Sequence, residues 1–250
     1  MNPRPSMPLS RRRLPILAVV VMLLLAFAVG AAVGQLGVPA ALVQRAKGLL
    51  AGSERPLQPP DAAASEYRRQ RLALFRASEA RADIVMLGDS HTAGGSWSEL
   101  LGRPALNRGI GWDSSQDVLE RLDEVIGRKP KVVFLLIGIV DLRYGMAPDL
   151  VAHNIEAIAA RLRDAGIRVV VQSVLPVAPH LREATNERVQ ALNARLRTLP
   201  DYLDLHPALV RDGALDPALT HDGIHLSGPA YLRWARLVTN ALQGRTPPAG

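Results

Sequence analysis

Two short polar blocks, far apart in the sequence, carry residue types that together could perform nucleophilic catalysis. The first is GDSHT, residues 88–92, which contains Ser90, and the second is HDGIHLS, residues 221–227, which contains Asp222 and His225 three positions apart. A carboxylate beside an imidazole fixes the tautomer of the ring and stabilises the imidazolium that forms when the ring takes a proton from serine. Each block alone also fits a structural role, as a Gly-Asp-Ser turn or as a loop histidine beside a helix-entry aspartate.

The elements that must position these blocks alternate between strand-like and helix-like patterns. Strand-like runs cover residues 82–88, 104–110, 131–138, 167–176 and 202–205, and helix-like patterns cover residues 115–126, 148–165, 184–199 and a last segment from about 227. Near-continuous apolar strands between amphipathic helices are typical of a parallel sheet covered on both faces. We therefore predict a three-layer α/β/α sandwich with a mostly parallel five-stranded sheet. Ligands bind at the carboxyl ends of such strands, and GDSHT follows the first strand directly.

Several single residues receive structural predictions. The helix-like stretch 61–80 leads into the domain, with Tyr67, Leu72 and Phe75 as candidate packing residues. Trp97 is predicted to pack in the core. The last helix is predicted to turn one face inward, and that face consists of Tyr231, Trp234, Ala235 and Val238. Asp89 and Asp141 are each predicted to hydrogen-bond their own turns.

Taken together, the two blocks resemble those of the SGNH/GDSL hydrolase family, which has GDS first and DxxH ahead of a C-terminal helix. The resemblance covers about Asp83 to Leu242 and includes NRGIGWDSS (107–115) and GIVDL (138–142). It implies that Ser90 attacks an ester carbonyl, that His225 takes the serine proton and that Asp222 orients His225. It implies no cofactor and no metal.

The resemblance also implies an oxyanion hole with three hydrogen-bond donors, and this sequence departs from the family pattern at two of them. Trp112 stands where the family has a glycine that donates its backbone N–H, and Val140 stands where the family has an asparagine. Removing one oxyanion donor typically lowers the rate about a hundred- to a thousand-fold. Three outcomes stay open: a slow enzyme, a replacement donor among His91, Asn107 and Arg143, or a domain that has lost catalysis. The Trp112 side chain is equally compatible with packing and with a place in the pocket.

Composition excludes several classes of function. The chain has no cysteine, which removes disulfides, thiolate catalysis and cysteine-ligated zinc. Aromatic residues make up only 4%, too few for a nucleic-acid stacking platform, and four arginines before residue 14 account for much of the net charge of +7. We therefore expect no nucleic-acid partner. The spacing of His221 and His225 fits a metal pair, but no third ligand is evident.

The N-terminal segment predicts a membrane location. Residues 14–33 are 20 residues without a charge, and as a helix they would span about 30 Å, the thickness of the hydrocarbon core. Arg11 to Arg13 precede this run, so the positive-inside rule places residues 1–13 in the cytoplasm. We predict a transmembrane helix over 14–34, a linker over 35–60 and an extracytoplasmic hydrolase domain over 61–245, periplasmic or at the cell surface. A cleaved signal peptide, with small residues at 30–32, is the alternative.

The sequence as a whole predicts a membrane-bound, extracytoplasmic serine esterase. Its substrate would be a small acyl ester, a lipid or an acetylated glycan. Two alternatives share the same site. One is an O-acyltransferase acting on envelope glycans, and the other is a catalytically weakened domain that binds glycans or lipids.

Overall fold

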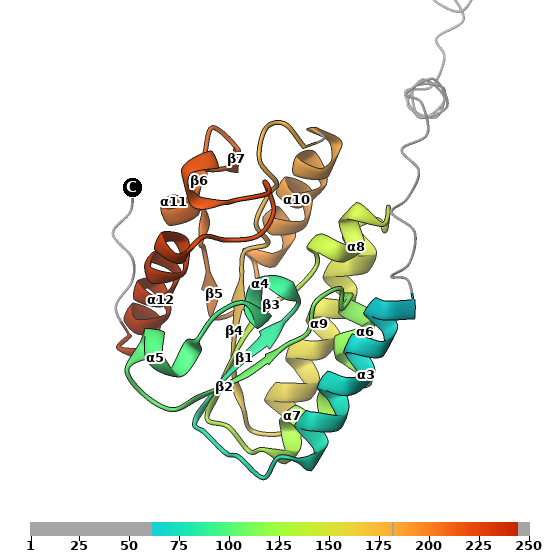
Figure 1. The fold of residues 1–250 in the computed structure, drawn as a ribbon, viewed down its shortest axis with the longest axis vertical. Coiled ribbons are helices and arrows are strands. Elements are labelled where there is room, and N and C mark those ends of the chain that lie inside the picture. The colour runs from blue at the N-terminus through green and yellow to red at the C-terminus, as the bar shows by residue number, and fades with distance from the viewer. Residues whose placement is uncertain (1–61, 182, 245–250) are drawn as a thin grey trace, which may run out of the picture. The chain divides into compact units, whose positions relative to one another are not determined.

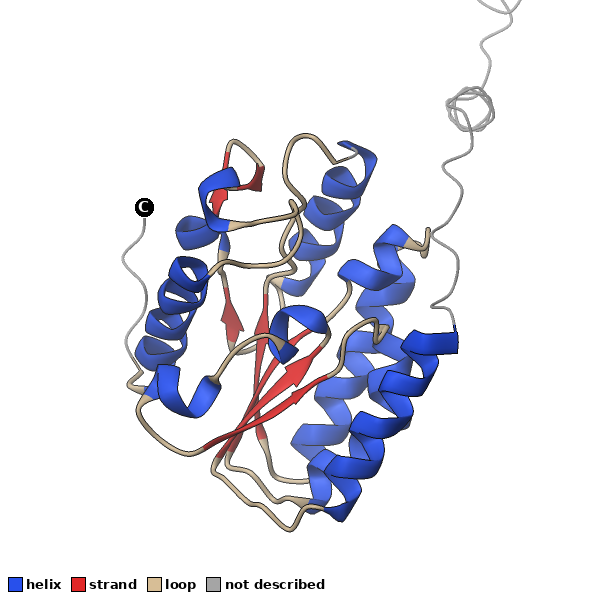
Figure 2. Cartoon of the chain, viewed as in Figure 1, coloured by secondary structure: helices blue, strands red, loops and turns tan. Residues whose placement is uncertain are grey.

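Five parallel strands form the centre of the fold in the computed structural model, which describes residues 62–181 and 183–244 (Figures 1 and 2). The strands are β1 Ile84–Gly88, β2 Ala105–Gly109, β3 Val132–Leu136, β4 Arg168–Gln172 and β5 Tyr202–Leu203. Their order across the sheet is β2-β1-β3-β4-β5, and every neighbouring pair is parallel. The predicted five-stranded parallel sheet is confirmed, with each strand somewhat shorter than its apolar run.

Alternation along the central strands divides the core into two layers. In β1, Val85 and Leu87 belong to the cluster on one face, whereas Ile84 and Met86 belong to the cluster on the other face. All residues of β1 and β3 are buried. Two buried faces explain why these strands are continuously apolar in sequence, because successive side chains point to opposite sides of the sheet.

Helices cover both faces. One face carries α6 Ser115–Glu120, α7 Leu122–Gly127, α9 Pro148–Asp164 and α10 Glu183–Leu196, with α3 Ala62–Ala77 beside α6 and α7; the other face carries α5 Trp97–Leu101, α11 His206–Leu209 and α12 Gly228–Leu242 (Figure 1). Trp97 is buried and packs edge-on against Trp234, with the ring centroids 4.7 Å apart. This confirms the packing role of Trp97. It also confirms the predicted inner face of the last helix, although Tyr231 on that face is only half-buried.

The helix predicted over residues 115–126 is broken in two. Arg121 separates α6 from α7, with φ of −106°. Its side chain is buried, where Nε donates to Asp113 at 2.7 Å and Nη2 donates to the carbonyls of Gly88 and Arg108. The hydrophobic periodicity of residues 115–126 does not predict the break at Arg121, because the interactions of Arg121 join residues up to 33 positions apart.

Helix α3 is held against α6 and α7 by polar contacts. Arg68 donates to Asp113 at 2.9 Å, and Arg128 donates to the carbonyl of Phe75 at 2.6 Å. Phe75 is buried as predicted and Leu72 is half-buried, but Tyr67 is 40% exposed, so its prediction as a packing residue is wrong.

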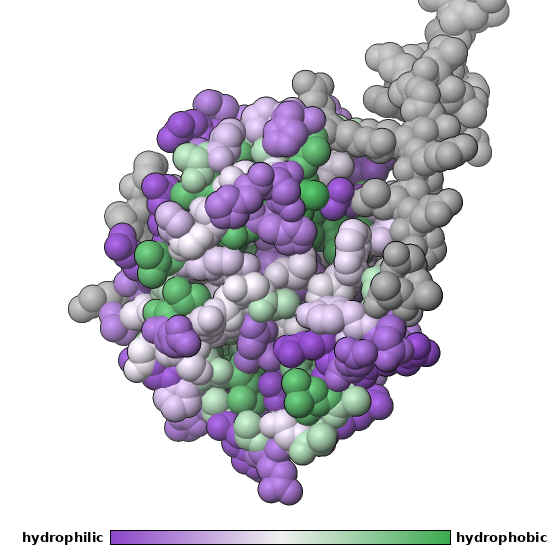
Figure 3. Space-filling model, viewed as in Figure 1, coloured by the Kyte–Doolittle hydropathy of each residue, from purple (hydrophilic) through white to green (hydrophobic). Residues whose placement is uncertain are grey.

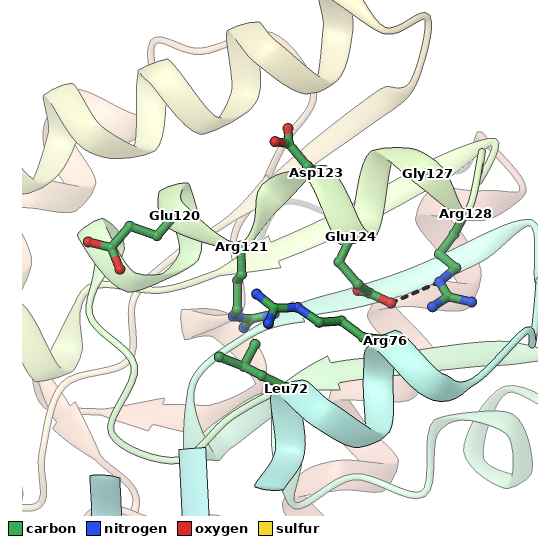
Figure 4. A pocket seen from close by; sticks show the side chains of 8 residues that line it. All are labelled: Leu72, Arg76, Glu120, Arg121, Asp123, Glu124, Gly127 and Arg128. Atoms are coloured by element: carbon green, nitrogen blue, oxygen red, sulfur yellow. Dashed lines mark hydrogen bonds and ion pairs between the residues drawn. The ribbon is translucent and has the colours of Figure 1, made fainter. Parts of the chain in front are cut away.

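A cavity of about 420 Å³ lies where α3 meets α6 and α7 (Figure 4). Its lining residues are Leu72, Arg76, Glu120, Arg121, Asp123, Glu124, Gly127 and Arg128. Acidic and basic side chains are balanced there, and Glu124 pairs with Arg128 across the cavity wall at 2.8 Å. Arg128 also donates to the carbonyl of Phe75, so this charged cluster connects the end of α7 to α3.

Shorter elements complete the fold at the carboxyl end of the sheet. They are α4 Ser90–Ala93, α8 Ile139–Arg143, the two-stranded pair β6 Val210–Arg211 and β7 Ala214–Leu215, and a 3₁₀ turn over Pro217–Leu219. On the face drawn in Figure 3, hydrophobic residues lie in scattered groups between hydrophilic ones. Within residues 62–181 and 183–244, no helix has the length and apolar character needed to cross a membrane. The predicted transmembrane segment 14–34 and the linker lie outside the described residues.

Candidate active site

Ser90 lies at the carboxyl end of the sheet, where the chain turns from β1 into α4. Asp89 caps this short helix, and its Oδ1 accepts from the backbone N–H of His91 at 2.9 Å, as predicted for a turn-forming aspartate. Gly109 allows α4 to lie directly against β2, because a Cβ at that position would lie 2.2 Å from the backbone nitrogen of Ala93. The sharp turn holds the hydroxyl of Ser90 above the end of β1.

A chain of hydrogen bonds connects Ser90 to the second polar block. Nε2 of His225 lies 3.1 Å from Oγ of Ser90, and Nδ1 of His225 lies 2.6 Å from Oδ2 of Asp222. The structure therefore brings together three residues that the sequence predicts to act as one group. Both Asp222 and His225 are about half exposed, so the chain opens to solvent.

Asp222 is held as a carboxylate. Partial burial raises its pKa, but hydrogen bonds from the His225 ring and from the backbone N–H groups of His225 and Ile224 outweigh this and lower the pKa well below that of an ordinary aspartate. An ionised Asp222 fixes the tautomer of His225 that leaves Nε2 free to accept the serine proton.

The side chain of His91 connects the block that carries Ser90 to the block that carries Asp222 and His225. Its ring is buried, with Nδ1 3.2 Å from Oδ1 of Asp89 and Nε2 2.9 Å from the carbonyl oxygen of Ile224. Burial lowers the pKa of His91, but the carboxylate of Asp89 and the carbonyl of Ile224 outweigh it, so the pKa is raised. Ile224 lies between Asp222 and His225, so His91 supports the loop that carries both. Because its contact with Ile224 spans 133 residues, no local sequence signal predicts this role.

Trp112 adopts the backbone conformation that favours glycine. Its φ is +71°, in the left-handed region, and its side chain is 47% exposed. A glycine would adopt this conformation without strain, whereas a residue with a Cβ adopts it at a strain of about 1–2 kcal/mol.

The second departure from the family pattern, Val140, is buried in the first turn of α8 and offers no hydrogen-bond donor. Two of the three candidate replacement donors are used elsewhere. Both ring nitrogens of His91 have other partners, and Nδ2 of Asn107 donates to the carbonyls of Ala93 and Gly95 at 3.0 Å. Arg143, at the last residue of α8, stays a prediction.

Asp141 connects α8 to the start of α6. Its carboxylate accepts from Oγ of Ser115 at 2.6 Å and from the backbone N–H of Ser115 at 3.0 Å. The prediction that Asp141 hydrogen-bonds its own turn is incomplete: the carboxylate bonds its own backbone, but it also bonds Ser115, 26 positions away. The bond between Asp141 and Ser115 fixes α8, which carries Val140, relative to the loop that carries Trp112. Burial raises the pKa of Asp141 to about 6, although the Ser115 bonds oppose this.

Among the described residues, no group of three or more His, Asp or Glu side chains is placed to hold a metal ion. His221 is exposed, directly before the loop that carries Asp222 and His225. The described residues do contain a hydrogen-bonded Ser-His-Asp chain at the carboxyl edge of a parallel sheet, in which a carboxylate holds an imidazole next to a hydroxyl.

Comparison with known proteins identifies the family. Residues 86–233 match the model of the GDSL-like lipase/acylhydrolase family, and the chain belongs to that family. It is 33% identical over 176 residues to the platelet-activating factor acetylhydrolase IB subunit alpha1 of Bos taurus, an alignment that covers 64% of this chain and 75% of the relative.

Solved structures show the same fold. A GDSL-like lipase from Bacteroides thetaiotaomicron is 25% identical, with a TM-score of 0.58, and the match covers 72% of this chain and 97% of that structure. An acetylxylan esterase from Geobacillus stearothermophilus, solved as a catalytic mutant, has a TM-score of 0.55 at 16% identity over 65% of this chain and 94% of that one. The second likeness is one of fold.

Proposed function

We propose that this protein hydrolyses carboxylic esters with Ser90 as the nucleophile. The observation that carries the proposal is the hydrogen-bonded chain from Oγ of Ser90 through His225 to Asp222, with lengths of 3.1 and 2.6 Å. It lies in a member of an acylhydrolase family, at the edge of the sheet where ligands bind in α/β folds.

The reaction proceeds in two halves. Oγ of Ser90 attacks the ester carbonyl while Nε2 of His225 takes the hydroxyl proton, and the C–O bond to the alcohol then breaks as His225 returns that proton to the leaving oxygen. Water next gives a proton to His225 and attacks the acyl carbonyl, the bond from the acyl carbon to Oγ breaks, and His225 returns the proton to Oγ, so that the acid and free Ser90 are released. The backbone N–H groups of Ser90 and Trp112 stabilise the oxyanion in both halves.

The substrate is proposed to be a small acyl ester, a lipid or an acetylated glycan. By name, the bovine relative is an acetylhydrolase, which supports an ester of a small acyl group. About half of the Asp222 and His225 side-chain surfaces face solvent. This exposure leaves room beside His225 for a large alcohol portion of the ester.

The catalytic domain is proposed to lie outside the cytoplasmic membrane, held there by a transmembrane helix over residues 14–34. The support is the uncharged run of 20 residues and the three arginines directly before it.

One observation favours a second candidate, a weakened domain that binds glycans or lipids. Val140 supplies no donor where the family asparagine would, and His91 and Asn107 do not replace it. On this alternative the triad geometry persists without appreciable turnover.

Three variants separate the two candidates. Ser90→Ala and His225→Ala should each lower kcat for an acetyl ester by about 10⁴-fold or more, and Asp222→Ala by less, since Asp222 orients rather than reacts. Circular dichroism should show all three folded, because these side chains are half-buried or exposed. Wild-type turnover by purified Ser90→Ala contradicts the assignment, and a wild type that turns over no ester favours the binding domain.

A further inference from the structure

Tyr67 and Ser90 face the same small space, although Tyr67 comes from a helix outside the residues that match the family. The point where a Cβ of Gly111 would lie is 3.6 Å from Cε1 of Tyr67 and 3.9 Å from Cβ of Ser90. Gly111 leaves this point empty. A gap about one methyl group wide is therefore open between the nucleophile and the Tyr67 ring.

Trp112 follows Gly111 directly in the chain and carries a second large ring. Tyr67 is 40% exposed and Trp112 is 47% exposed, and neither serves the core. The residues that follow them, Arg68 and Asp113, form an ion pair at 2.9 Å, and Asp113 is fully buried and also bound by Arg121. This ion pair, in which Asp113 is buried and Arg68 is partly exposed, ties together the two backbone segments that carry the rings, so α3 lies against the Trp112 loop.

The position of His225 determines whether the alcohol or the acyl part of an ester lies next to Tyr67 and Gly111. His225 must protonate the leaving alcohol, so the alcohol lies on the side of Ser90 next to His225 Nε2. His225 leads into α12, which covers one face of the sheet, whereas α3 lies with α6 and α7 on the other face (Figure 1). The acyl group takes the side away from His225, and that side leads past Gly111 to Tyr67.

We propose that Tyr67, Gly111 and Trp112 form the acyl-binding subsite and that, among the small acyl esters proposed above, they favour acyl chains a few carbons longer than acetyl. The proposal rests on the ester hydrolysis proposed above and adds a specificity-determining role for α3. The absence of a side chain at Gly111 makes room for the first carbons of the acyl chain. Further methylene groups of that chain move out of water and into contact with the rings of Tyr67 and Trp112, which is favourable for apolar groups. On this proposal, Tyr67 and Trp112 are exposed because they bury the acyl chain of the substrate, and this also gives a role to Trp112 in its strained conformation.

A series of p-nitrophenyl esters with acyl chains of two to eight carbons tests the subsite, because the leaving group and its chemistry stay constant. For the full-length protein we expect kcat/KM to rise roughly two- to fourfold with each methylene until the chain passes the rings. Tyr67→Ala should flatten this rise, and Tyr67→Phe should retain it, since the ring rather than the hydroxyl makes the contact.

Gly111→Ala is the sharper variant. Its methyl would meet only ordinary van der Waals contacts, so the fold is retained, but it fills the gap and should lower kcat/KM for the longest ester at least tenfold relative to the acetyl ester. Leu74→Ala is the matched control, since Leu74 is 57% exposed on the same helix two turns from Tyr67, and it should reproduce the wild-type series.

The outcomes separate this inference from the proposed function. If the wild type hydrolyses the esters and Tyr67→Ala and Gly111→Ala keep its chain-length profile, the acyl subsite is refuted and the hydrolase assignment stands. If the wild type hydrolyses none of the series and Ser90 takes up no covalent ester analogue, both are refuted.

Discussion

At the scale of the residue, the oxyanion side of the site combines a strained tryptophan with a valine that cannot donate. Trp112 has φ of +71°, and Val140 is only 8% exposed in the first turn of α8. Each departure can be tested at a single position with a matched control.

The strain at Trp112 should appear as a difference between two truncations. Trp112→Gly and Trp112→Ala both remove the indole, but only alanine keeps a Cβ in the left-handed region. We expect the glycine variant to be more stable by about 1 kcal/mol in urea unfolding, because that conformation costs a residue with a Cβ about 1–2 kcal/mol. Equal stabilities would mean that the loop relaxes when the indole is removed.

Val140→Asn should restore a third oxyanion donor if the loop keeps the family geometry. One donor is worth up to about 3 kcal/mol, and imperfect alignment reduces the expected gain in kcat to about tenfold. KM should change less, because the donor acts where negative charge develops. Burying an amide should also lower the free energy of unfolding by about 1–3 kcal/mol. Val140→Ala controls for lost volume, and a similar rise in kcat for both variants would rule out a donor effect.

The sequence predicts residues at this scale where the chemistry itself restricts the residue type. Ser90, Asp222 and His225 are recognisable because nucleophile, base and carboxylate have few substitutes. His91 is different: a buried histidine that holds Ile224 from 133 positions away has no local pattern, so the sequence suggested only an oxyanion donor. Tyr67 is predicted wrongly because helical periodicity identifies an apolar face but not which of its residues the rest of the fold covers, and Tyr67 is 40% exposed.

At the scale of the element, polar bonds between residues far apart in the sequence set the relative positions of the loops. The hydrophobic periodicity of the sequence does not determine these positions. The strands were predictable because two buried faces require continuous apolar runs. The break at Arg121 and the bridge from Asp141 to Ser115 were not, because they depend on partners 33 and 26 positions away. These two interactions hold the Trp112 and Val140 loops at one edge of the sheet.

The burial of Asp141 predicts a pH dependence of stability. Its pKa is raised from 3.8 to about 6, so the folded protein binds this proton more tightly than the unfolded chain does. The resulting stabilisation is present below about pH 4 and is lost as the pH rises through 6, by at most about 3 kcal/mol. Asp141→Asn lacks this titration, so the free energy of unfolding of the wild type should fall relative to that of Asp141→Asn between pH 4 and 7. Parallel pH profiles would contradict the shift.

At the scale of the whole molecule, the family match over residues 86–233 does not include α3, yet α3 is fixed to the Trp112 loop through Arg68 and Asp113. We therefore regard residues from 62 onward as one catalytic unit. The fold class was predictable from alternating patterns, whereas the contribution of α3 to the site depends on its docking.

The proposed membrane location makes a prediction at the same scale. If residues 14–34 form a retained transmembrane helix, the protein should remain with the membrane fraction after carbonate extraction, and its intact mass should include the N-terminus. A mature chain that begins near Gln35 would replace the helix with a cleaved signal peptide.

The central claim is that Ser90 is the nucleophile, and covalent labelling tests it most directly. A fluorophosphonate reacts with a serine that a neighbouring base activates, so the wild-type protein should gain one adduct by intact mass, and peptide mapping should place it on Ser90. Ser90→Ala should take up none, and His225→Ala should react far more slowly although its serine is intact. An unlabelled wild type, an adduct on another residue, or equal labelling of wild type and Ser90→Ala would contradict the account.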